Sequence, residues 1–411
     1  MRRLLIVFSA FLLILAGCGS GSSEGYQEGD EVTLTFAFWD DLWAPAFEAM
    51  ADEFEEAHPG VTIETQVTPY SSYWTKMDTI ASTGDGPDIF VMNTPNIEKY
   101  YESGMLAPLD DALADQNVNK DDFVDRTFDA YEVDGATYGV PFNYDVSMLF
   151  YNIDLVKEAG IDKIPETWDE MLDAGQKILD YDSSLYPLVL QGNQAGYWPV
   201  MVSQGAEIIT EDGKSGYESQ EMLDSINWIK SAVENGIIPK SSSISSTAPL
   251  DVLQSGQAAF ALDGSWMLQK TESDTGVNIG VAPIPSNNEN RAGIIHAPAI
   301  SVNEQSPNAE IATEFAAFVG TDSSQEKVAT DMGQLAAKKG FDDLFVEKNS
   351  KLVGLEDTLQ YTGTAAVYPH VIDGSWENVE IEDMNKVMDL SMEPQDAADD
   401  ITAAIEKSSE R

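Results

Sequence analysis

Cysteine and positive charge are both scarce in this chain of 411 residues. Cys18 is the only cysteine, so no disulfide can form within the chain. Lys and Arg together number 22 against 71 Asp and Glu, which gives a formal net charge of −49. A surface this acidic repels nucleic acid, so we expect no nucleic-acid partner. Salt should stabilise the fold because it screens the self-repulsion, as suits a saline habitat.

Metal-binding motifs are also lacking. Histidine occurs only at positions 58, 296 and 370, without partners at the spacing of a zinc site. Residues 115–121 have the spacing of a calcium loop, yet Lys120 stands where glycine is needed and Arg126 where glutamate is needed. We therefore predict no metal and no cofactor. The sequence has no Gly-x-Ser-x-Gly elbow, phosphate loop or dinucleotide fingerprint, so we predict no catalytic group, and an acid/base pair among the 71 carboxylates stays open.

The first eighteen residues predict export. Two arginines, an apolar run from Leu4 to Leu15 and small residues before Cys18 are typical of a signal peptide, here residues 1–17. The run is shorter than the roughly 20 residues that span a membrane. The stretch Leu15–Cys18 resembles the lipobox of bacterial lipoproteins, which implies a lipid on Cys18 and an extracytoplasmic, membrane-anchored protein. The alternative is an ordinary signal peptide with a coincidental cysteine. Residues 18–30, rich in Gly, Ser and Glu, predict a flexible tether.

The next segments alternate between strand and helix. Strand periodicity at 32–38, 61–67 and 88–92 is separated by helical periodicity at 44–58 and 73–82. This order predicts an α/β fold with parallel strands, whose carboxyl ends hold ligands. Further patterns predict strands at 139–152, 257–263 and 294–302, and helices at 167–180, 219–235 and 395–406.

The order of several segments resembles that of the family 1 extracellular solute-binding proteins, the group that includes maltose-binding protein. The segments are 36–39, 53–63, 86–91, 139–152, 167–170 and 258–266. The resemblance implies a two-lobed periplasmic-binding-protein fold of type II with hinge segments. Lobe 1 would comprise 31–143 plus 297–336, and lobe 2 would comprise 144–296 plus 337–411. Residues 291–298 lack the double glycine associated with one hinge crossing, so a contact from His296 stays open.

The resemblance also implies a function. The chain would be the substrate-binding lipoprotein of an ABC importer, a monomer and not an enzyme, which captures a sugar between its lobes and delivers it to permease subunits. The alternatives are a binding protein for another polar solute, such as a polyol, polyamine or organic cation, and a secreted carbohydrate-active enzyme.

A sugar needs aromatic rings for its C–H faces and polar side chains for its hydroxyls. In lobe 1 we predict ligand contacts from Trp39 and Asp40, after the first strand, and from Asn93 beside Thr94, after the third. The bland alternatives are a core tryptophan with a helix-capping aspartate, and an ordinary turn. On the first crossing we predict contacts from Tyr144 and Asp145, with a hinge hydrogen bond as the alternative.

In the second lobe, Trp198 beside Tyr197 is expected to precede a helix and to form an aromatic platform. Trp266 follows the turn that begins at Asp263, and we predict that both contact ligand, with core packing as the alternative for Trp266. Tyr361 and Trp376 are predicted to close the site from the C-terminal segment. The other tryptophans are assigned to packing, at positions 43, 74, 168 and 228.

Overall fold

The structure is a computed structural model of the chain. It describes Gly29 and residues 31–83, 86–210, 213–244, 248–272, 275–287, 294–361, 366–367 and 375–409. The expected signal peptide and the lipidation expected at Cys18 lie outside the described residues, and so does nearly all of the expected tether.

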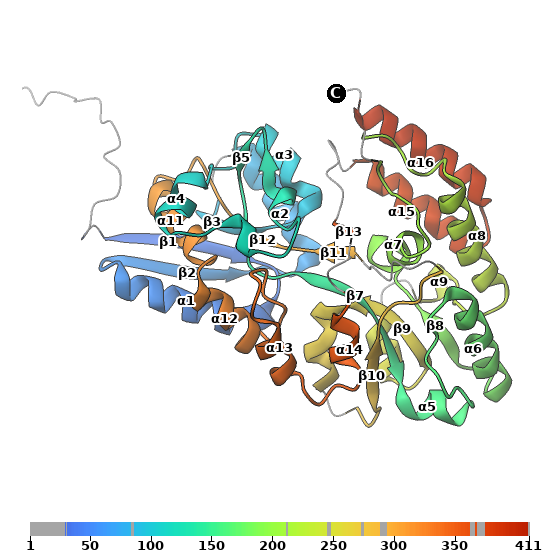
Figure 1. Cartoon of the computed structure of the whole chain (residues 1–411). Helices are drawn as coiled ribbons and strands as arrows, with labels where there is room; N and C mark the ends of the chain where they lie inside the picture. Colours follow the sequence, from blue (N-terminus) through green and yellow to red (C-terminus); the bar gives the residue numbers. More distant parts are fainter. Residues whose placement is uncertain are drawn as a thin grey trace, which may run out of the picture.

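Two β-sheets form two lobes that lie side by side (Figure 1). The first sheet has the strand order β2-β1-β3-β12-β6. Strand β1 is parallel to β2 and β3, whereas β12 is antiparallel to β3 and β6. The bounds are β1 Val32–Phe38, β2 Val61–Val67, β3 Ile89–Met92, β6 Val140–Pro141 and β12 Ala299–Val302, with a separate hairpin of β4 Glu132–Val133 and β5 Ala136–Thr137.

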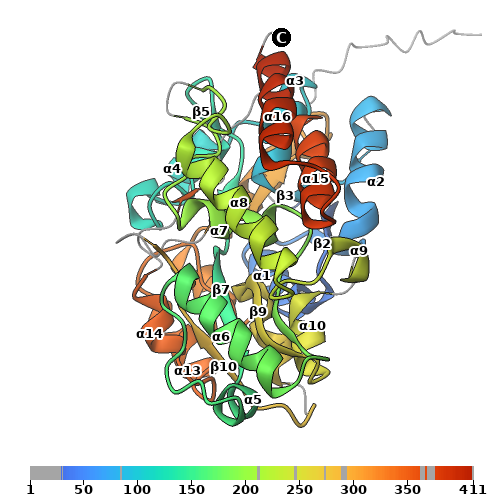
Figure 2. The ribbon, with the colours of Figure 1, turned by 90° about the vertical axis from the view of Figure 1, so that its right-hand side faces the viewer.

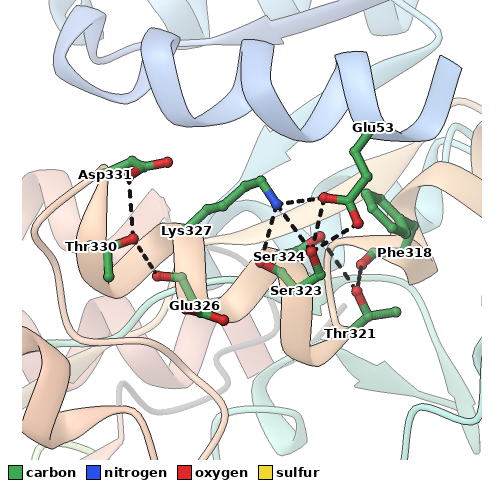
Figure 3. Close-up of polar contacts among 9 residues, drawn as sticks. All are labelled: Glu53, Phe318, Thr321, Ser323, Ser324, Glu326, Lys327, Thr330 and Asp331. Carbon is green, nitrogen blue, oxygen red and sulfur yellow. Dashed lines mark hydrogen bonds and ion pairs between the residues drawn. The ribbon is translucent and has the colours of Figure 1, made fainter. Parts of the chain in front are cut away.

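Helices cover both faces of the first sheet because its inner strands β3 and β12 are buried along their whole length. Along β1, Phe36 and Phe38 join the core that contains α1 and α11, whereas Ala37 joins the core that contains α2 and α3. An ion pair between Glu53 on α1 and Lys327 on α12 holds these two helices together (Figure 3). The bounds are α1 Ala44–Ala57, α2 Tyr70–Thr83, α3 Ile97–Glu102, α4 Asp110–Asp115, α11 Ala309–Phe318 and α12 Asp322–Thr330.

The second sheet has the order β13-β11-β7-β9-β8, and β10 pairs with β7. Strand β7 is antiparallel to β9, β10 and β11, whereas β8 is parallel to β9. All eight residues of β7 are buried, which makes it the centre of this lobe. The bounds are β7 Asp145–Asn152, β8 Tyr186–Val189, β9 Ala258–Gly264, β10 Ile279–Ala282, β11 Ile294–His296 and β13 Ala366–Val367.

Two groups of helices enclose the second sheet. One core contains residues of α6, α7, α8, α15 and α16, and a second core contains residues of α10, α13 and α14. The two C-terminal helices pack on each other and on α8 (Figures 1 and 2). The bounds are α5 Ile153–Glu158, α6 Trp168–Tyr181, α7 Gln194–Val202, α8 Gln220–Glu234, α9 Ser241–Ile244, α10 Pro249–Gln254, α13 Asp342–Lys348, α14 Leu355–Leu359, α15 Ser375–Met388 and α16 Pro394–Ser409.

Within the described chain, the backbone passes from one lobe to the other in three places. The first crossing joins β6 to β7, the second joins β11 to β12, and the third joins α12 to α13. The first and third run together, because Tyr144 N donates to Leu335 O at 3.0 Å and Ala337 N donates to Phe142 O at 3.1 Å. These hydrogen bonds make the crossings one connected hinge region.

The structure corrects three sequence-based predictions of secondary structure. Residues 139–152 and 294–302 are not single strands, because each run is divided by a crossing, and Pro298 has no N–H to continue a ladder at the second. Trp198 lies inside α7 and does not precede a helix. Helix α15 begins at Ser375, where the sequence pattern predicted no helix.

Candidate functional site

The strand ends of the two sheets face each other between the lobes. In the first sheet, β3 ends at Met92, which pairs with Ala299 at the start of the antiparallel β12. In the second sheet, β9 ends at Gly264, which pairs with Ser147 near the start of β7. Side chains just beyond these positions therefore converge on one space, as expected for ligand sites in α/β proteins.

Aromatic rings form the wall on the side of lobe 1. Trp39 directly follows β1, and its ring centroid lies 5.2 Å from that of Trp43 and 5.5 Å from that of Tyr70. Trp43 is only 2% exposed, so it supports Trp39 from the core while its edge still reaches the cavity. Trp39 is half-buried and presents an apolar ring to the space between the lobes.

Asp40 and Asn93 place polar groups beside these rings. Asp40 caps a short 3₁₀ helix by accepting a hydrogen bond of 3.0 Å from Leu42 N. Burial raises the pKa of Asp40 above its usual value, although the bond from Leu42 opposes this. The Oδ1 of Asn93 accepts a hydrogen bond of 2.7 Å from Asn96, and Thr94 lines the cavity next to it.

Asp145, the first residue of β7, lies where the hinge meets the cavity. Its Oδ1 accepts a hydrogen bond of 2.8 Å from Ser265 Oγ, and its Oδ2 accepts one of 3.2 Å from Asn143 Nδ2. Burial raises the pKa of Asp145 to about 7, and the negative charge of Asp40 adds to the rise, against the hydrogen bonds from Ser265 and Asn143. The carboxyl group of Asp145 therefore titrates near neutral pH.

Trp266 forms the aromatic wall on the side of lobe 2. Its ring packs edge-on against His296, with the centroids 5.4 Å apart. Burial lowers the pKa of His296 to about 4, so this imidazole is neutral at pH 7. A Cβ on Gly264 would lie 1.9 Å from the Trp266 ring, so only glycine lets the ring lie against the backbone here.

The start of α7 supplies the remaining polar groups. Asn193 is the N-cap residue of α7, yet its side chain makes no capping hydrogen bond, and its Oδ1 is buried without a hydrogen-bond partner in the described structure. Gln194 Nε2 donates to Glu380 Oε2 at 3.2 Å. Within the described structure, the buried amide oxygen of Asn193 is therefore available to accept a hydrogen bond from a ligand.

These groups enclose a cavity of about 450 Å³, within the range of small-molecule sites. Among the described residues, its lining contains no Lys and no Arg. The lining residues come from both lobes and from the hinge: Trp39, Asp40, Trp43, Tyr70, Asn93, Thr94, Pro95, Asp145, Gln191, Asn193, Gln194, Ala195, Trp266, His296, Ala297 and Pro298.

Half of the ligand contacts expected from sequence line this cavity, namely Trp39, Asp40, Asn93, Asp145 and Trp266. The other five do not. Tyr144 is 2% exposed and donates to Asp342, and Asp263 is 3% exposed within β9, where burial raises its pKa to about 7. Tyr361 is 36% exposed, after α14.

Trp198 and Trp376 lie in the core of lobe 2 and not on the cavity wall. Their rings stack with centroids 6.1 Å apart, and both are at most 1% exposed. The indole of Trp198 and the hydroxyl of Tyr217 both donate hydrogen bonds to the buried carboxylate of Glu380. Burial raises the pKa of Glu380 to about 7.

Sequence reasoning missed the loop that leads into α7. Gln191, Asn193 and Gln194 follow β8, whose end faces the cavity, so the strand rule that selected Trp39 could have found them. Tyr70 reaches the wall from the first turn of α2, for which the sequence offered no sign. The described residues contain no cluster of three or more His, Cys, Asp or Glu side chains able to hold a metal ion.

Two α/β lobes, three hinge crossings and one cavity lined from both sides define a two-lobed binding protein. The chain belongs to the bacterial extracellular solute-binding protein family, whose model matches residues 40–326. Members of this family bind solutes and do not catalyse reactions, so the chain is a solute-binding protein and not an enzyme.

The relatives agree with this assignment. The chain is similar to an arabinooligosaccharide-binding protein of Bacillus subtilis, with 25% identity over 342 residues that cover 80% of this chain and 78% of the relative. It is also similar to a galactooligosaccharide-binding protein of the same organism, with 24% identity over 353 residues that cover 80% and 79%.

Solved structures share the fold. A substrate-binding protein of Listeria monocytogenes in complex with cycloalternan superposes with a TM-score of 0.84 at 22% identity, covering 93% of this chain and all of that one. A maltose-bound protein of T. maritima superposes with a TM-score of 0.78 at 20% identity, covering 91% and 99%. Within the described residues, no helix has both the length and the apolar character that a bilayer crossing requires.

Proposed function

We propose that this protein is the sugar-capturing component of an ABC importer, with a sugar or oligosaccharide as its ligand. The observation that carries the proposal is that Trp39 and Trp266 flank one cavity from opposite lobes, with Asp40 and Asp145 beside them. Rings suit the C–H faces of a pyranose, and carboxylates accept hydrogen bonds from its hydroxyls. The similarity to an arabinooligosaccharide-binding and a galactooligosaccharide-binding protein supports the same ligand class.

Ligand capture proceeds by closure of the lobes about the hinge. The proposed units are 31–143 plus 297–336 for lobe 1 and 144–296 plus 337–411 for lobe 2. The ligand shifts the equilibrium toward the closed form only through contacts that are better there than in the open form. A cavity lined by both lobes meets this condition, and the closed form is the one that permease subunits recognise.

The proposal places the protein outside the cell membrane, tethered by a lipid on Cys18. The support is the order of basic, apolar and small residues that ends in Leu15-Ala16-Gly17-Cys18. Metabolic labelling with a fatty-acid probe tests this, because Cys18→Ala should remove both the label and the membrane association. Label retained in the variant would contradict the anchor.

Calorimetry and thermal shift with neutral mono- to tetrasaccharides test the ligand class. Affinities in the micromolar range are expected, which corresponds to about 8 kcal/mol. Trp39→Ala and Trp266→Ala should each weaken binding by about tenfold, since each removes one stacking surface. Tyr181→Ala is the matched control, because this tyrosine is 50% exposed on α6 and does not line the cavity. If no sugar raises the melting temperature, the proposal is wrong.

A further inference from the structure

The cavity presents hydrogen-bond acceptors and negative charge. Asp40 and Asp145 line it together, and they are close enough for the charge of Asp40 to act on Asp145. The buried Oδ1 of Asn193 adds a third acceptor, which has no partner in the described structure. A ligand that satisfies this set must bring several donors of its own.

No positive side chain balances these carboxylates within the described lining. His296 is neutral at pH 7 because burial lowers its pKa to about 4. Lys270 acts electrostatically on Asp40, but it is not a lining residue, and its Nζ lies 3.9 Å from the carboxylate of Asp251. On the other side, Glu377 of α15 is near enough to interact electrostatically with Tyr70, which adds further negative potential.

The start of α7 is a feature that favours an anion, since a helix N-terminus carries about half a positive charge. Two carboxylates outweigh it even when Asp145 is half protonated. A carboxylate or phosphate on the ligand would therefore enter a site of the same sign, shielded from water, where like charges repel strongly. An ammonium group would instead supply three donors and the missing positive charge.

We propose that the cavity selects sugars by charge: it admits neutral sugars, binds amine-bearing sugars more tightly, and excludes uronic acids and sugar phosphates. This rests on the proposed function and narrows its ligand class. A charge-assisted hydrogen bond is stronger than a neutral one, and the difference corresponds to about five- to tenfold in affinity.

Matched trisaccharides provide the test. The β-1,4-linked trimers of glucose, 6-amino-6-deoxyglucose and glucuronate share one linkage and one ring configuration and differ only at C6, where the amine is charged at pH 7.5. The corresponding galactose series provides a second set. Calorimetry at pH 7.5 and fixed salt should give the amine member a dissociation constant about five- to tenfold lower than that of the neutral member. The uronate member should bind at least about tenfold more weakly than the neutral one.

Two carboxamide substitutions assign the effect to the carboxylates. In the double variant Asp40→Asn, Asp145→Asn, the preference for the amine over the hydroxyl should fall toward one, whereas neutral binding changes less. Asp52→Asn is the control, because Asp52 is exposed on α1 and does not line the cavity. Thermal unfolding of each variant checks that the fold is intact.

The possible results distinguish failure of the charge selection from failure of sugar capture. Charge selection is wrong if the uronate binds as tightly as the neutral trisaccharide, or if the amine binds no more tightly than the neutral one. Either result remains compatible with sugar capture. A preference that survives in the double variant also overturns it, since the carboxylates would then not be its source. Absence of binding by every member of both series and by the wider neutral panel counts against sugar capture itself.

Discussion

Ser265 Oγ donates a hydrogen bond of 2.8 Å to Asp145 Oδ1, joining lobe 2 to a hinge residue that lines the cavity. The other oxygen of Asp145 accepts from Asn143, whose amide also donates to Gln334 Oε1 at 2.7 Å on the third crossing. His296, on the second crossing, pairs with Asp145 across the sheet. Asp145 thus connects the cavity to all three crossings. It reaches the first and third through its carboxyl group and Asn143, and the second through strand pairing with His296.

The first prediction concerns pH and Asp145. Its pKa of about 7 in the folded protein exceeds the usual 3.8 because of burial, so the folded state holds a proton that the unfolded chain releases near pH 4. Between about pH 4 and 7 the folded state binds more protons, so this group's contribution to stability falls as pH rises. Asp145→Asn should therefore raise the free energy of unfolding at pH 8 by about 1–3 kcal/mol, with little gain near pH 5.

Denaturant unfolding of wild type and variant across this range provides the measurement. The comparison of variant with wild type is needed because other buried groups also make stability depend on pH. The contributions of Asp263 and Glu380 to stability fall as pH rises, like that of Asp145, whereas the contribution of His296 rises with pH below about pH 6.5. The control Asp52→Asn should leave the change of the unfolding free energy with pH as it is in wild type. A gain from Asp145→Asn that is the same at pH 5 and pH 8 would contradict the argument.

The second prediction concerns the close contact between Gly264 and Trp266. A methyl group at position 264 would collide with the indole, so Gly264→Ala should displace the ring and weaken sugar binding by about tenfold, as Trp266→Ala does. In the double variant the two losses should not add, because alanine at 264 has no ring left to move. Additive losses, measured by calorimetry, would show that Gly264 acts by another route.

The third prediction concerns Glu380, whose buried carboxylate holds Trp198, Tyr217 and Gln194. Glu380→Ala leaves these buried donors without an acceptor and should lower the free energy of unfolding by about 3–5 kcal/mol. At pH 5, where the wild-type carboxyl group is protonated, Glu380→Gln keeps the volume and one acceptor and should cost about 1–2 kcal/mol. This cost should shrink toward pH 8, because burial raises the pKa of Glu380 to about 7. Glu382→Gln on the same helix is the control, since Glu382 is exposed and pairs only with Lys386 among the described contacts. Equal stability of the alanine variant and wild type would rule out this role.

The fourth prediction concerns salt. A formal net charge of −49 repels itself, and the Debye length falls from about 30 Å at 10 mM salt to about 3 Å at 1 M. The melting temperature should therefore rise by several degrees between these concentrations in sodium chloride. Equal melting temperatures would mean that the charges are too widely spaced to destabilise the fold.

The parallel strands of the first sheet were predictable from local sequence. Strands β1 and β2 have the predicted bounds of 32–38 and 61–67, because both alternate and both end at turn residues. The sheet-to-sheet crossings were not visible as breaks in the pattern. Residues 139–152 are buried throughout, since each sheet buries its half of the run, and periodicity cannot reveal a change of sheet.

For the site, too, local sequence identified some residues correctly, whereas others depend on partners far away in the chain. Trp39 and Trp266 could be selected because each follows a strand, and strand ends carry ligands in this kind of fold. Trp198 could not be separated from them by local pattern. Its indole N–H can be buried because it donates a hydrogen bond to Glu380, which lies 182 positions away in the sequence. The residues around Trp198 give no indication of this partner.

The interleaved connections have a consequence for synthesis of the chain. In the first sheet, β12 lies between β3 and β6, although nearly 160 residues separate β6 from it in the sequence. As the polypeptide emerges from the ribosome, β1, β2 and β3 appear early, but one edge of β3 has no partner until β12 follows at Ala299–Val302. The first sheet is therefore incomplete for most of translation, and the unpaired edge of β3 is the part of the nascent chain that a holding chaperone would protect.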